Sequence, residues 1–272
     1  MCLNESVLSF VDIIKTYPDK PDVPVLDIGN FELKKGEHVA IIGEIGSGKT
    51  TFAKIAAGLL KPESGEVKRF GSWLKYDKKK KHNLDARIGY LSQKPEEQVF
   101  NTSVYKEVVY ALKSRSFSND LCWKMVENAC KIVDIDLDYY GDLNPFTLSE
   151  GELRRVGIAS SIVYDPELLI LDEPAASLDN ASKNIILTKI FKRYSSSKNS
   201  LILITHDFEI VLRFFNRVVV LREGKIICDC APIELIIIND FECLTGLKLP
   251  FIAEFYRELM LRGINLKFKC KE

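Results

Sequence analysis

The sequence has no long hydrophobic run and no excess of charge of either sign. Its apolar stretches, such as Leu168 to Leu171 and Leu235 to Ile238, are far shorter than the roughly 18 residues of a membrane-spanning helix. Lys and Arg number 38, and Asp and Glu also number 38, so the formal net charge is zero. A neutral chain is not attracted as a whole to nucleic acid, although a local basic patch stays open. We therefore expect no nucleic-acid partner.

The cysteines lack the spacing of a disulfide framework, and the N-terminus lacks a basic segment followed by an apolar one. The seven cysteines are Cys2, Cys122, Cys130, Cys228, Cys230, Cys243 and Cys270. An odd, scattered set predicts reduced thiols. Cys228 and Cys230 share one face of an expected strand, but no second pair or nearby histidine completes a metal site. Without a signal pattern, we expect a soluble cytoplasmic protein.

One stretch carries a strong chemical signal. Residues 43–50 (GEIGSGKT) match G-x-x-x-x-G-K-[ST], the phosphate-binding P-loop. An apolar segment at 39–42 is typical of a buried strand, and the apolar spacing over 51–60 predicts a helix. A plain glycine turn between strand and helix is the alternative. We expect the nucleotide to be bound by Gly43, Gly46, Ser47, Gly48, Lys49, Thr50 and Thr51.

The chemistry of a triphosphate explains these residue types. Glycine allows backbone N–H groups to approach phosphate oxygens closely, and the following helix presents its positive dipole end to the anion. We expect Lys49 to reach the β- and γ-phosphates and the Thr50 hydroxyl to bind Mg²⁺. The expected ligands are therefore ATP and Mg²⁺.

The pattern of apolar residues predicts an α/β fold. We expect strands at 7–15, 25–33, 39–42, 66–73, 87–92, 168–171, 201–204, 217–223 and 225–229. We expect helices at 51–60, 103–113, 120–133, 148–162, 180–194 and 249–262. The first two strands suggest an antiparallel subdomain beside a parallel P-loop NTPase core, and the helices at about 102–164 suggest an inserted helical subdomain. The expected domains are an ATPase domain at 1–235 and a helical extension at 236–272.

Polar residues follow two of the expected core strands. Asp172 and Glu173 end the strand at 168–171, and ligands of parallel sheets bind at such strand ends. We expect Asp172 to hold the magnesium shell and Glu173 to polarise the attacking water as a general base. His206 follows the strand at 201–204, where an imidazole could hydrogen-bond the γ-phosphate. An acidic loop and an inert histidine at a strand end are the alternatives.

The lysine run from Lys78 to Lys81 is most simply a solvated loop, with attraction to anionic lipids as the alternative.

The order of these motifs resembles that of the ATP-binding-cassette (ABC) ATPases over nearly the whole chain. The P-loop, Gln93, the segment 148–152 (LSEGE), the Asp172-Glu173 pair, the segment 177–179 (SLD) and His206 follow one another as in that family. The resemblance implies that Gln93 is the Q-loop glutamine, which bridges the metal site and the transmembrane partner. It further implies that Ser149 and Gly151 belong to the signature and that Asp179 is the D-loop aspartate. His206 would be the switch histidine, and Tyr17, on the loop upstream, would stack on the adenine ring.

The family resemblance also implies a dimer. Two cassettes sandwich two ATP molecules, and Ser149 and the Gly151 N–H would bind the γ-phosphate held by the other subunit. Glu150 departs from the usual Leu-Ser-Gly-Gly signature, because it puts a carboxylate beside the triphosphate and a Cβ where close approach is needed. Either Glu150 points away, or the site it completes is weak. A heterodimer with a second, standard cassette would tolerate the weak site, and we favour the heterodimer over a homodimer.

A finer resemblance is to the energy-coupling factor (ECF) transporter ATPases, which include cobalt and nickel uptake cassettes. Residues 93–100 (QKPEEQVF), 153–156 (LRRV) and the tail 249–263 carry it. In that group the C-terminal helices help to hold two ATPases together, and Gln98 would lie on the short helix that couples to the scaffold. The leading hypothesis is an ATPase at the cytoplasmic face of the membrane, powering uptake of a vitamin or metal ion. Its partners would be a second ATPase, a transmembrane scaffold and a substrate-binding membrane protein.

Three alternatives stay open. A conventional ABC importer ATPase should lack the tail and the Glu97-Gln98 segment. A soluble ABC ATPase of DNA repair or translation needs long coiled-coil insertions or tandem cassettes, for which the chain has no room. A nucleotide switch without hydrolysis disagrees with the presence of both Glu173 and His206.

Overall fold

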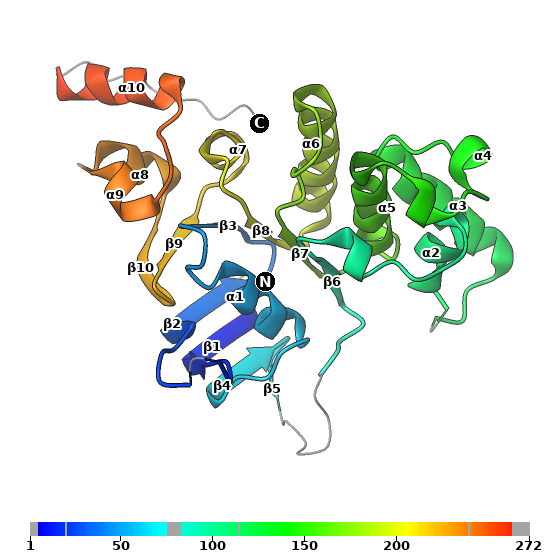
Figure 1. Ribbon diagram of the computed structural model, residues 1–272, viewed down its shortest axis with the longest axis horizontal. Helices are drawn as coiled ribbons and strands as arrows, with labels where there is room; N and C mark the ends of the chain where they lie inside the picture. Colours follow the sequence, from blue (N-terminus) through cyan, green and yellow to red (C-terminus); the bar gives the residue numbers. More distant parts are fainter. Residues whose placement is uncertain (1–4, 20, 75–82, 114, 239, 263–272) are drawn as a thin grey trace. The chain divides into compact units, whose positions relative to one another are not determined.

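The computed structural model describes residues 5–19, 21–74, 83–113, 115–238 and 240–262 (Figure 1). They fall into two compact units: the first unit contains the residues up to Leu84 and those from Ile202 onward, and the second unit contains Asp85 to Leu201. The expected lysine-rich loop at Lys78 to Lys81 lies outside the described residues.

The first unit contains an antiparallel sheet of four strands, as the sequence predicts for its first part. Its order is β2 (Leu26–Lys34), β1 (Ser6–Lys15), β4 (Ser64–Arg69) and β5 (Ser72–Trp73). The single strand expected at 66–73 is wrong, because the chain turns at Phe70 and Gly71, where φ is +47° and +80°. Such left-handed backbone interrupts an extended strand.

The first unit also carries the strand and helix that flank the predicted P-loop. Strand β3 (His38–Ile42) pairs in parallel with β9 (Val218–Arg222), which pairs antiparallel with β10 (Lys225–Cys230). Helix α1 (Lys49–Ala57) follows the loop and ends three residues before the expected 60. It ends there because Gly58 adopts φ +80°, a common helix C-terminal conformation.

Aromatic packing fixes α1 against the antiparallel sheet. Phe52 of α1 lies 4.8 Å from Phe10 and 5.0 Å from Phe31, measured between ring centroids, and all three side chains are buried. Such tilted and edge-on pairs add to the free energy of burial. The apolar side chains of α1 therefore hold the start of this helix against the antiparallel sheet.

Short helices complete the first unit. Strand β8 (Ser200–Ile204) enters this unit and is followed by α7 (Phe208–Phe214), α8 (Pro232–Ile237), α9 (Phe241–Thr245) and α10 (Phe251–Leu261). Helix α8 packs against α7 and α10, and α9 packs against β9, as the orange and red end of Figure 1 shows. Only α10 is predicted from the sequence, since the other three have at most seven residues, too few for a helical periodicity.

The second unit contains two parallel strands and the helices expected between residues 103 and 194. Strands β6 (Ile88–Leu91) and β7 (Leu168–Asp172) pair in register from Ile88–Leu168 to Leu91–Leu171. The helices are α2 (Val104–Tyr110), α3 (Asn119–Ile132), α4 (Leu137–Tyr140), α5 (Glu150–Ile162) and α6 (Asn180–Ser197). Helix α5 packs against α2, α3 and β6. Helix α6 ends three residues beyond the expected 194, and α4 is not predicted.

Two further expectations concern membrane spans and cysteines. In the ranges that the structure describes, no helix has the length and apolar character to span a membrane. The cysteines within these ranges are free thiols: Cys122, Cys130, Cys228, Cys230 and Cys243. The Sγ atoms of Cys228 and Cys230 are 3.2 Å apart, so both face the same side of β10, as expected.

Candidate functional site

The loop at 43–50 has the backbone that the P-loop motif predicts. Gly43, Gly46 and Gly48 have φ angles of +149°, +83° and +101°, which L side chains rarely adopt. A Cβ at Gly43 would overlap the backbone oxygen of Leu221, and one at Gly48 would overlap that of Val25. Glycine is therefore required at 43 and 48 by both conformation and space. At Gly46 a Cβ would meet no atom within 4 Å, so there only the conformation requires it.

Lys49 lies across this loop, at the start of α1. Its Nζ donates to the carbonyl oxygens of Gly43 and Glu44, both at 2.7 Å, and to Ser47 Oγ at 3.4 Å. Gly48 is the N-cap of α1, and the first turn contains no acidic side chain. The N-terminus of α1, with its backbone N–H groups, and an ammonium group therefore converge on one loop, which suits a phosphate anion.

Tyr17 and His206 are the other predicted site residues of the first unit. Tyr17 lies beside α1, with its hydroxyl 3.3 Å from Thr51 Oγ1. His206 is exposed and follows Thr205, whose N–H donates to the carbonyl of Ile41 in β3 at 3.2 Å. Ile41 is two residues before the loop. The P-loop and His206 therefore follow the carboxyl ends of two neighbouring strands, β3 and β8. The structure thus brings Tyr17, residues 43–51 and His206 together in one unit.

A contact with the C-terminal segment was not predicted. Gly246, which ends α9 with φ +70°, approaches Glu44 so closely that a Cβ would overlap the Glu44 side chain. Arg222 Nη1 also donates to the carbonyl of Cys243 in α9 at 2.9 Å. Both contacts join residues far apart in the sequence, so no local pattern could predict them.

The second unit places Asp172 and Glu173 at the carboxyl end of β7. The five residues of β7 are fully buried, and the exposed fractions of Asp172 and Glu173 are 1% and 8%. Glu173 has φ +51°, an unfavourable conformation for a residue with a side chain. Two buried carboxylates at the end of a parallel strand fit a divalent cation with oxygen ligands, as the sequence predicts.

Arg154 of α5 joins the Glu173 and Gln93 segments, a role that the sequence does not predict. Its Nη1 donates to the carbonyl of Glu173 at 2.9 Å, and its Nη2 donates to the carbonyl of Gln93 at 2.8 Å. Arg154 is 2% exposed. Desolvation lowers the pKa of Arg154, although neighbouring carboxylates, Glu150 foremost, oppose this effect.

A capping box forms the start of α5, in the predicted signature. Ser149 Oγ accepts from the Glu152 N–H at 3.3 Å, and Glu152 Oε2 accepts from the Ser149 N–H at 2.8 Å and from Ser149 Oγ at 2.6 Å. The Tyr140 hydroxyl donates to Glu152 Oε1 at 2.7 Å. The hydrogen bond from the Ser149 side chain, followed by that from Tyr140, lowers the pKa of the Glu152 carboxyl. Ser149 is therefore held in place at an exposed helix N-terminus.

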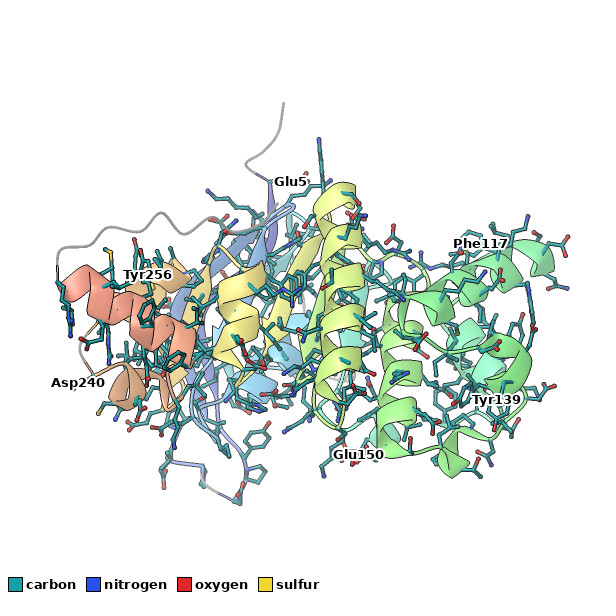
Figure 2. All side chains as sticks on the ribbon, turned by 90° about the horizontal axis from the view of Figure 1, so that it is seen from above. Glu5, Phe117, Tyr139, Glu150, Asp240 and Tyr256 are labelled. Carbon is teal, nitrogen blue, oxygen red and sulfur yellow. The ribbon has the colours of Figure 1, made fainter. Side chains whose placement is uncertain are left out.

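Glu150 is directed toward the predicted D-loop of its own chain. Its Oε1 accepts a hydrogen bond from Ser177 Oγ, and Glu150 lies at the start of α5, where Figure 2 labels it. A Cβ on Gly151 would lie 2.9 Å from the Ser177 carbonyl oxygen, so glycine permits this close approach. The Glu150 carboxylate is thus engaged by a hydroxyl of its own chain.

Asp179 caps α6 in the same unit. Its Oδ1 accepts from the N–H groups of Ala181 at 3.0 Å and Ser182 at 2.9 Å. The hydrogen bond from the Ser182 side chain is the largest cause of the lowered pKa of Asp179. The predicted D-loop aspartate therefore also determines where α6 begins.

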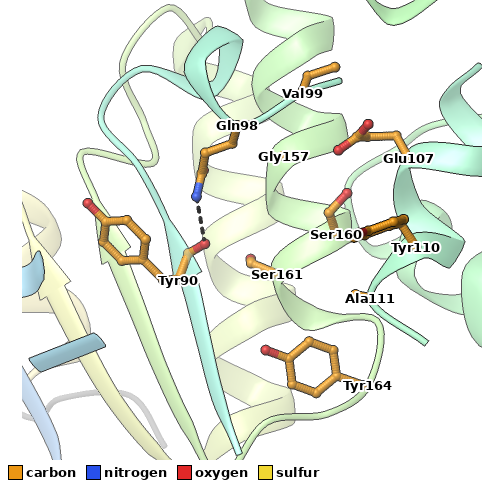
Figure 3. Close-up of a pocket in the computed structure, with 10 residues that line it drawn as sticks. All are labelled: Tyr90, Gln98, Val99, Glu107, Tyr110, Ala111, Gly157, Ser160, Ser161 and Tyr164. Carbon is orange, nitrogen blue, oxygen red and sulfur yellow. Dashed lines mark hydrogen bonds between the residues drawn. The ribbon is translucent and has the colours of Figure 1, made fainter. Parts of the chain in front are cut away.

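A cavity of about 180 Å³ lies beside the segment that follows Gln93 (Figure 3). Gln98 anchors this segment: its Nε2 donates to the Tyr90 carbonyl at 3.3 Å, and its Oε1 accepts from the Ser92 N–H at 2.8 Å. Burial raises the pKa of the Tyr164 hydroxyl to about 12. The cavity is lined by Tyr90, Gln98, Val99, Glu107, Tyr110, Ala111, Gly157, Ser160, Ser161 and Tyr164.

The predicted site residues thus form two groups, one in each unit. The first group contains Tyr17, residues 43–51 and His206, and the second group contains Gln93, Ser149, Gly151, Asp172, Glu173 and Asp179. Within the described ranges, no three His, Cys, Asp or Glu side chains cluster as a complete metal site. The residues present nevertheless fit Mg²⁺ bound together with a nucleotide, because Mg²⁺ usually takes one or two protein oxygens and completes its shell with phosphate and water.

Comparison with known proteins gives one consistent family. Residues 26–176, more than half of the chain, match the family model described as "ABC transporter". The ECF transporter ATP-binding protein EcfA2 of Clostridium tetani is 35% identical over 89% of this chain and 84% of that protein. EcfA2 of Thermotoga maritima is 38% identical over 85% of this chain and 82% of that protein.

A solved structure agrees in fold and sequence. The cbiO1 protein of Clostridium perfringens, described as part of an ABC transporter complex, has a TM-score of 0.73 and 31% identity. The match covers 93% of this chain and 99% of that one. Proteins of this family bind ATP with Mg²⁺, dimerise and work with transmembrane partners. The chain belongs to the ABC transporter ATPases and is an ATP-binding, ATP-hydrolysing subunit of an ABC transporter.

Proposed function

We propose that this chain powers an ECF-type importer that takes up a vitamin or a metal ion. The glycine loop at 43–50, with Lys49 lying across it at the N-terminus of α1, is the observation that carries the ATPase part of the proposal. The importer type is supported by the EcfA2 relatives, which are similar over most of their length.

The first group of site residues binds the nucleotide in this proposal. Lys49 exchanges its loop carbonyl partners for β- and γ-phosphate oxygens, which carry full negative charge and bind an ammonium more strongly. The glycine amides and the α1 N-terminus complete the phosphate cradle, and Tyr17 stacks on the adenine. Thr50, Asp172 and Gln93 would hold Mg²⁺, which would neutralise charge on the phosphates.

The second group supplies the base and the contact to a neighbouring cassette. Glu173 orients the attacking water and accepts its proton, while His206, from the first group, donates a hydrogen bond to the γ-phosphate. Ser149 and the Gly151 N–H face the γ-phosphate held by the other subunit, and Asp179 lies in that interface. ATP thus closes two cassettes, and its hydrolysis lets them part, which moves the membrane partner.

We favour a second, different cassette as the neighbour. Glu150 keeps a carboxylate in the first turn of α5, where a γ-phosphate would also bind, so the composite site completed by this chain carries one additional negative charge. The hydrogen bond from Ser177 reduces the penalty without removing the charge. A partner cassette with a standard signature would supply the stronger site.

Two surfaces suit the remaining partners. The cavity beside Gln98 lies next to the Q-loop segment and would receive part of a transmembrane scaffold (Figure 3). The exposed apolar side chains of α10 would pack against the second ATPase. In this proposal the chain is a peripheral subunit at the cytoplasmic face of the membrane.

Affinity purification of the tagged full chain from native membranes tests the importer type. We expect to recover a second cassette, a multi-spanning scaffold and a small substrate-binding membrane protein. Recovery with a conventional two-subunit permease would favour the alternative importer class. Recovery without any membrane protein would favour a soluble ABC ATPase and overturn the proposal.

A further inference from the structure

We propose that Arg154 is a positioning residue for ATP hydrolysis, which holds the Gln93 and Glu173 segments in register with the signature helix α5. The inference rests on the proposed role of Glu173 as the base. Arg154 itself lies in α5, three residues after Gly151.

Two backbone carbonyls accept hydrogen bonds from the terminal nitrogens of the buried Arg154 guanidinium, while its Nε has no partner among the described residues. A buried guanidinium is expensive unless its donors are satisfied. The Arg154 side chain is 2% exposed, and its two terminal nitrogens donate to the Glu173 and Gln93 carbonyls at 2.9 Å and 2.8 Å. These carbonyls are 80 residues apart in the sequence, so the planar fork of one side chain joins two separate segments.

The backbone at Glu173 has an unfavourable conformation that contacts to its carbonyl must stabilise. Glu173 has φ +51°, and its carbonyl also accepts from the Ala176 N–H at 3.2 Å, which closes the turn after β7. An unfavourable backbone conformation persists only where its surroundings enforce it. Arg154 supplies a charged donor to this carbonyl and thereby fixes the direction in which the Glu173 side chain leaves the turn.

The same helix contacts the chain beyond Glu173. Glu150 accepts from Ser177 Oγ, and Gly151 packs closely on the Ser177 carbonyl. Residues 173 and 177 are therefore both tied to the first turns of α5. A displacement of α5, which carries the signature, must pass to the Glu173 turn and to Gln93. Closure of the signature on a neighbouring nucleotide would in this way align the base with the metal-site glutamine.

The test compares Arg154→Met, which keeps length but not donors, with Arg154→Lys, which keeps the charge but not the fork. In the full chain with its partner cassette, we expect Arg154→Met to lower kcat by about ten- to a hundredfold, because small misplacement of a catalytic group has such effects. The KM for Mg-ATP should stay within about twofold, since binding is supplied by the P-loop. Arg154→Lys should recover part of kcat by reaching one carbonyl.

Arg193→Met is the matched control. Arg193 belongs to α6 of the same unit and donates to Asp165 Oδ1 at 3.0 Å. Its substitution therefore removes a guanidinium that is bound to neither the Gln93 nor the Glu173 segment. Its kcat should equal that of the unchanged protein. Hydrogen exchange at residues 92–95 and 172–176 should accelerate in both Arg154 variants and not in the control.

The outcomes separate this inference from the proposed function. Unchanged kcat in Arg154→Met, with Glu173→Gln inactive, would overturn the positioning role alone. Unchanged kcat in Glu173→Gln would overturn the base assignment itself. If Arg154→Met does not fold, the decision falls to Arg154→Lys: a lower kcat at constant KM supports the inference, and unchanged kcat and exchange overturn it.

Discussion

Glu150 is the residue at which this cassette departs from the usual signature, and its hydrogen bond with Ser177 limits the consequence. The hydroxyl holds the carboxylate on the D-loop side, while Ser149 and Gly151 keep their places at the helix N-terminus. A carboxylate released from this bond would compete with a phosphate for the same positive dipole end.

We therefore predict that Ser177→Ala lowers turnover of the assembled ATPase by about threefold to tenfold, the value of a typical hydrogen bond. In a Glu150→Gly background the same substitution should have little effect, because no carboxylate is left to release. Steady-state hydrolysis of the two single variants and the double variant measures this coupling. An equal loss in both backgrounds would show that Ser177 acts independently of Glu150.

Glu152 gives the start of α5 a pH dependence. Its pKa is lowered in the folded chain, so the stabilisation is complete above the pKa of the unfolded chain and is lost as the pH falls through the lower folded value. We predict that thermal stability falls more steeply between about pH 5 and about pH 3 than in Glu152→Gln, since glutamine keeps the cap but cannot titrate. Thermal unfolding followed by circular dichroism at several pH values measures the difference. Parallel curves for the two proteins would contradict it.

The P-loop is the element in which backbone geometry matters most. We predict that Gly46→Ala costs about 1 kcal/mol of unfolding free energy in the absence of nucleotide, because only its positive φ is unfavourable. Gly43→Ala should cost about 3 kcal/mol or more, because its Cβ would also overlap the Leu221 carbonyl. Urea unfolding of both variants provides the comparison. Equal losses would show that the loop relaxes away from β9.

The elements predicted well are those with a clear period or a defined motif. The loop with α1, the buried strand β7 and the longer helices α3 and α5 were each read from local pattern. The single strand predicted at 66–73 is wrong, because the turn at Phe70 and Gly71 leaves no mark in the pattern of apolar residues. Short helices such as α9 also lack one.

The candidate site could be predicted only as far as local sequence reaches. Lys49, Asp172, Glu173 and His206 belong to motifs, and their positions beside strand ends follow from order along the chain. Arg154 lies in the segment 153–156, but its contacts could not be predicted, because its partners are 19 and 61 residues away and are backbone atoms of any residue type. The contact of Gly246 with Glu44 depends in the same way on tertiary packing.

At the scale of the whole molecule, α10 offers an apolar face. Phe251 and Phe255 are 81% and 53% exposed, whereas Tyr256 on the same helix, labelled in Figure 2, is buried. We predict that Phe251→Ser with Phe255→Ser weakens association with the second ATPase about tenfold and leaves thermal stability nearly unchanged. Tyr256→Ser should instead destabilise the fold. Analytical ultracentrifugation of the paired cassettes checks both, and unchanged association would remove α10 from the interface.

Hydrolysis should control how long the two cassettes stay together. We predict that Glu173→Gln binds Mg-ATP normally, lowers turnover at least about a hundredfold and accumulates the closed ATP-bound dimer, because the base is absent while the phosphate cradle remains. Light scattering with ATP and then with ADP measures the dimer. A variant that hydrolyses ATP normally would reject Glu173 as the base.

The most direct test is to substitute Lys49 in the assembled transporter. Lys49→Ala removes the ammonium that lies across the P-loop, so Mg-ATP affinity should fall by at least about tenfold and ATP-dependent uptake of the transported molecule should cease. Both are measured in proteoliposomes containing the complete complex. Unchanged nucleotide affinity together with unchanged uptake would contradict the account.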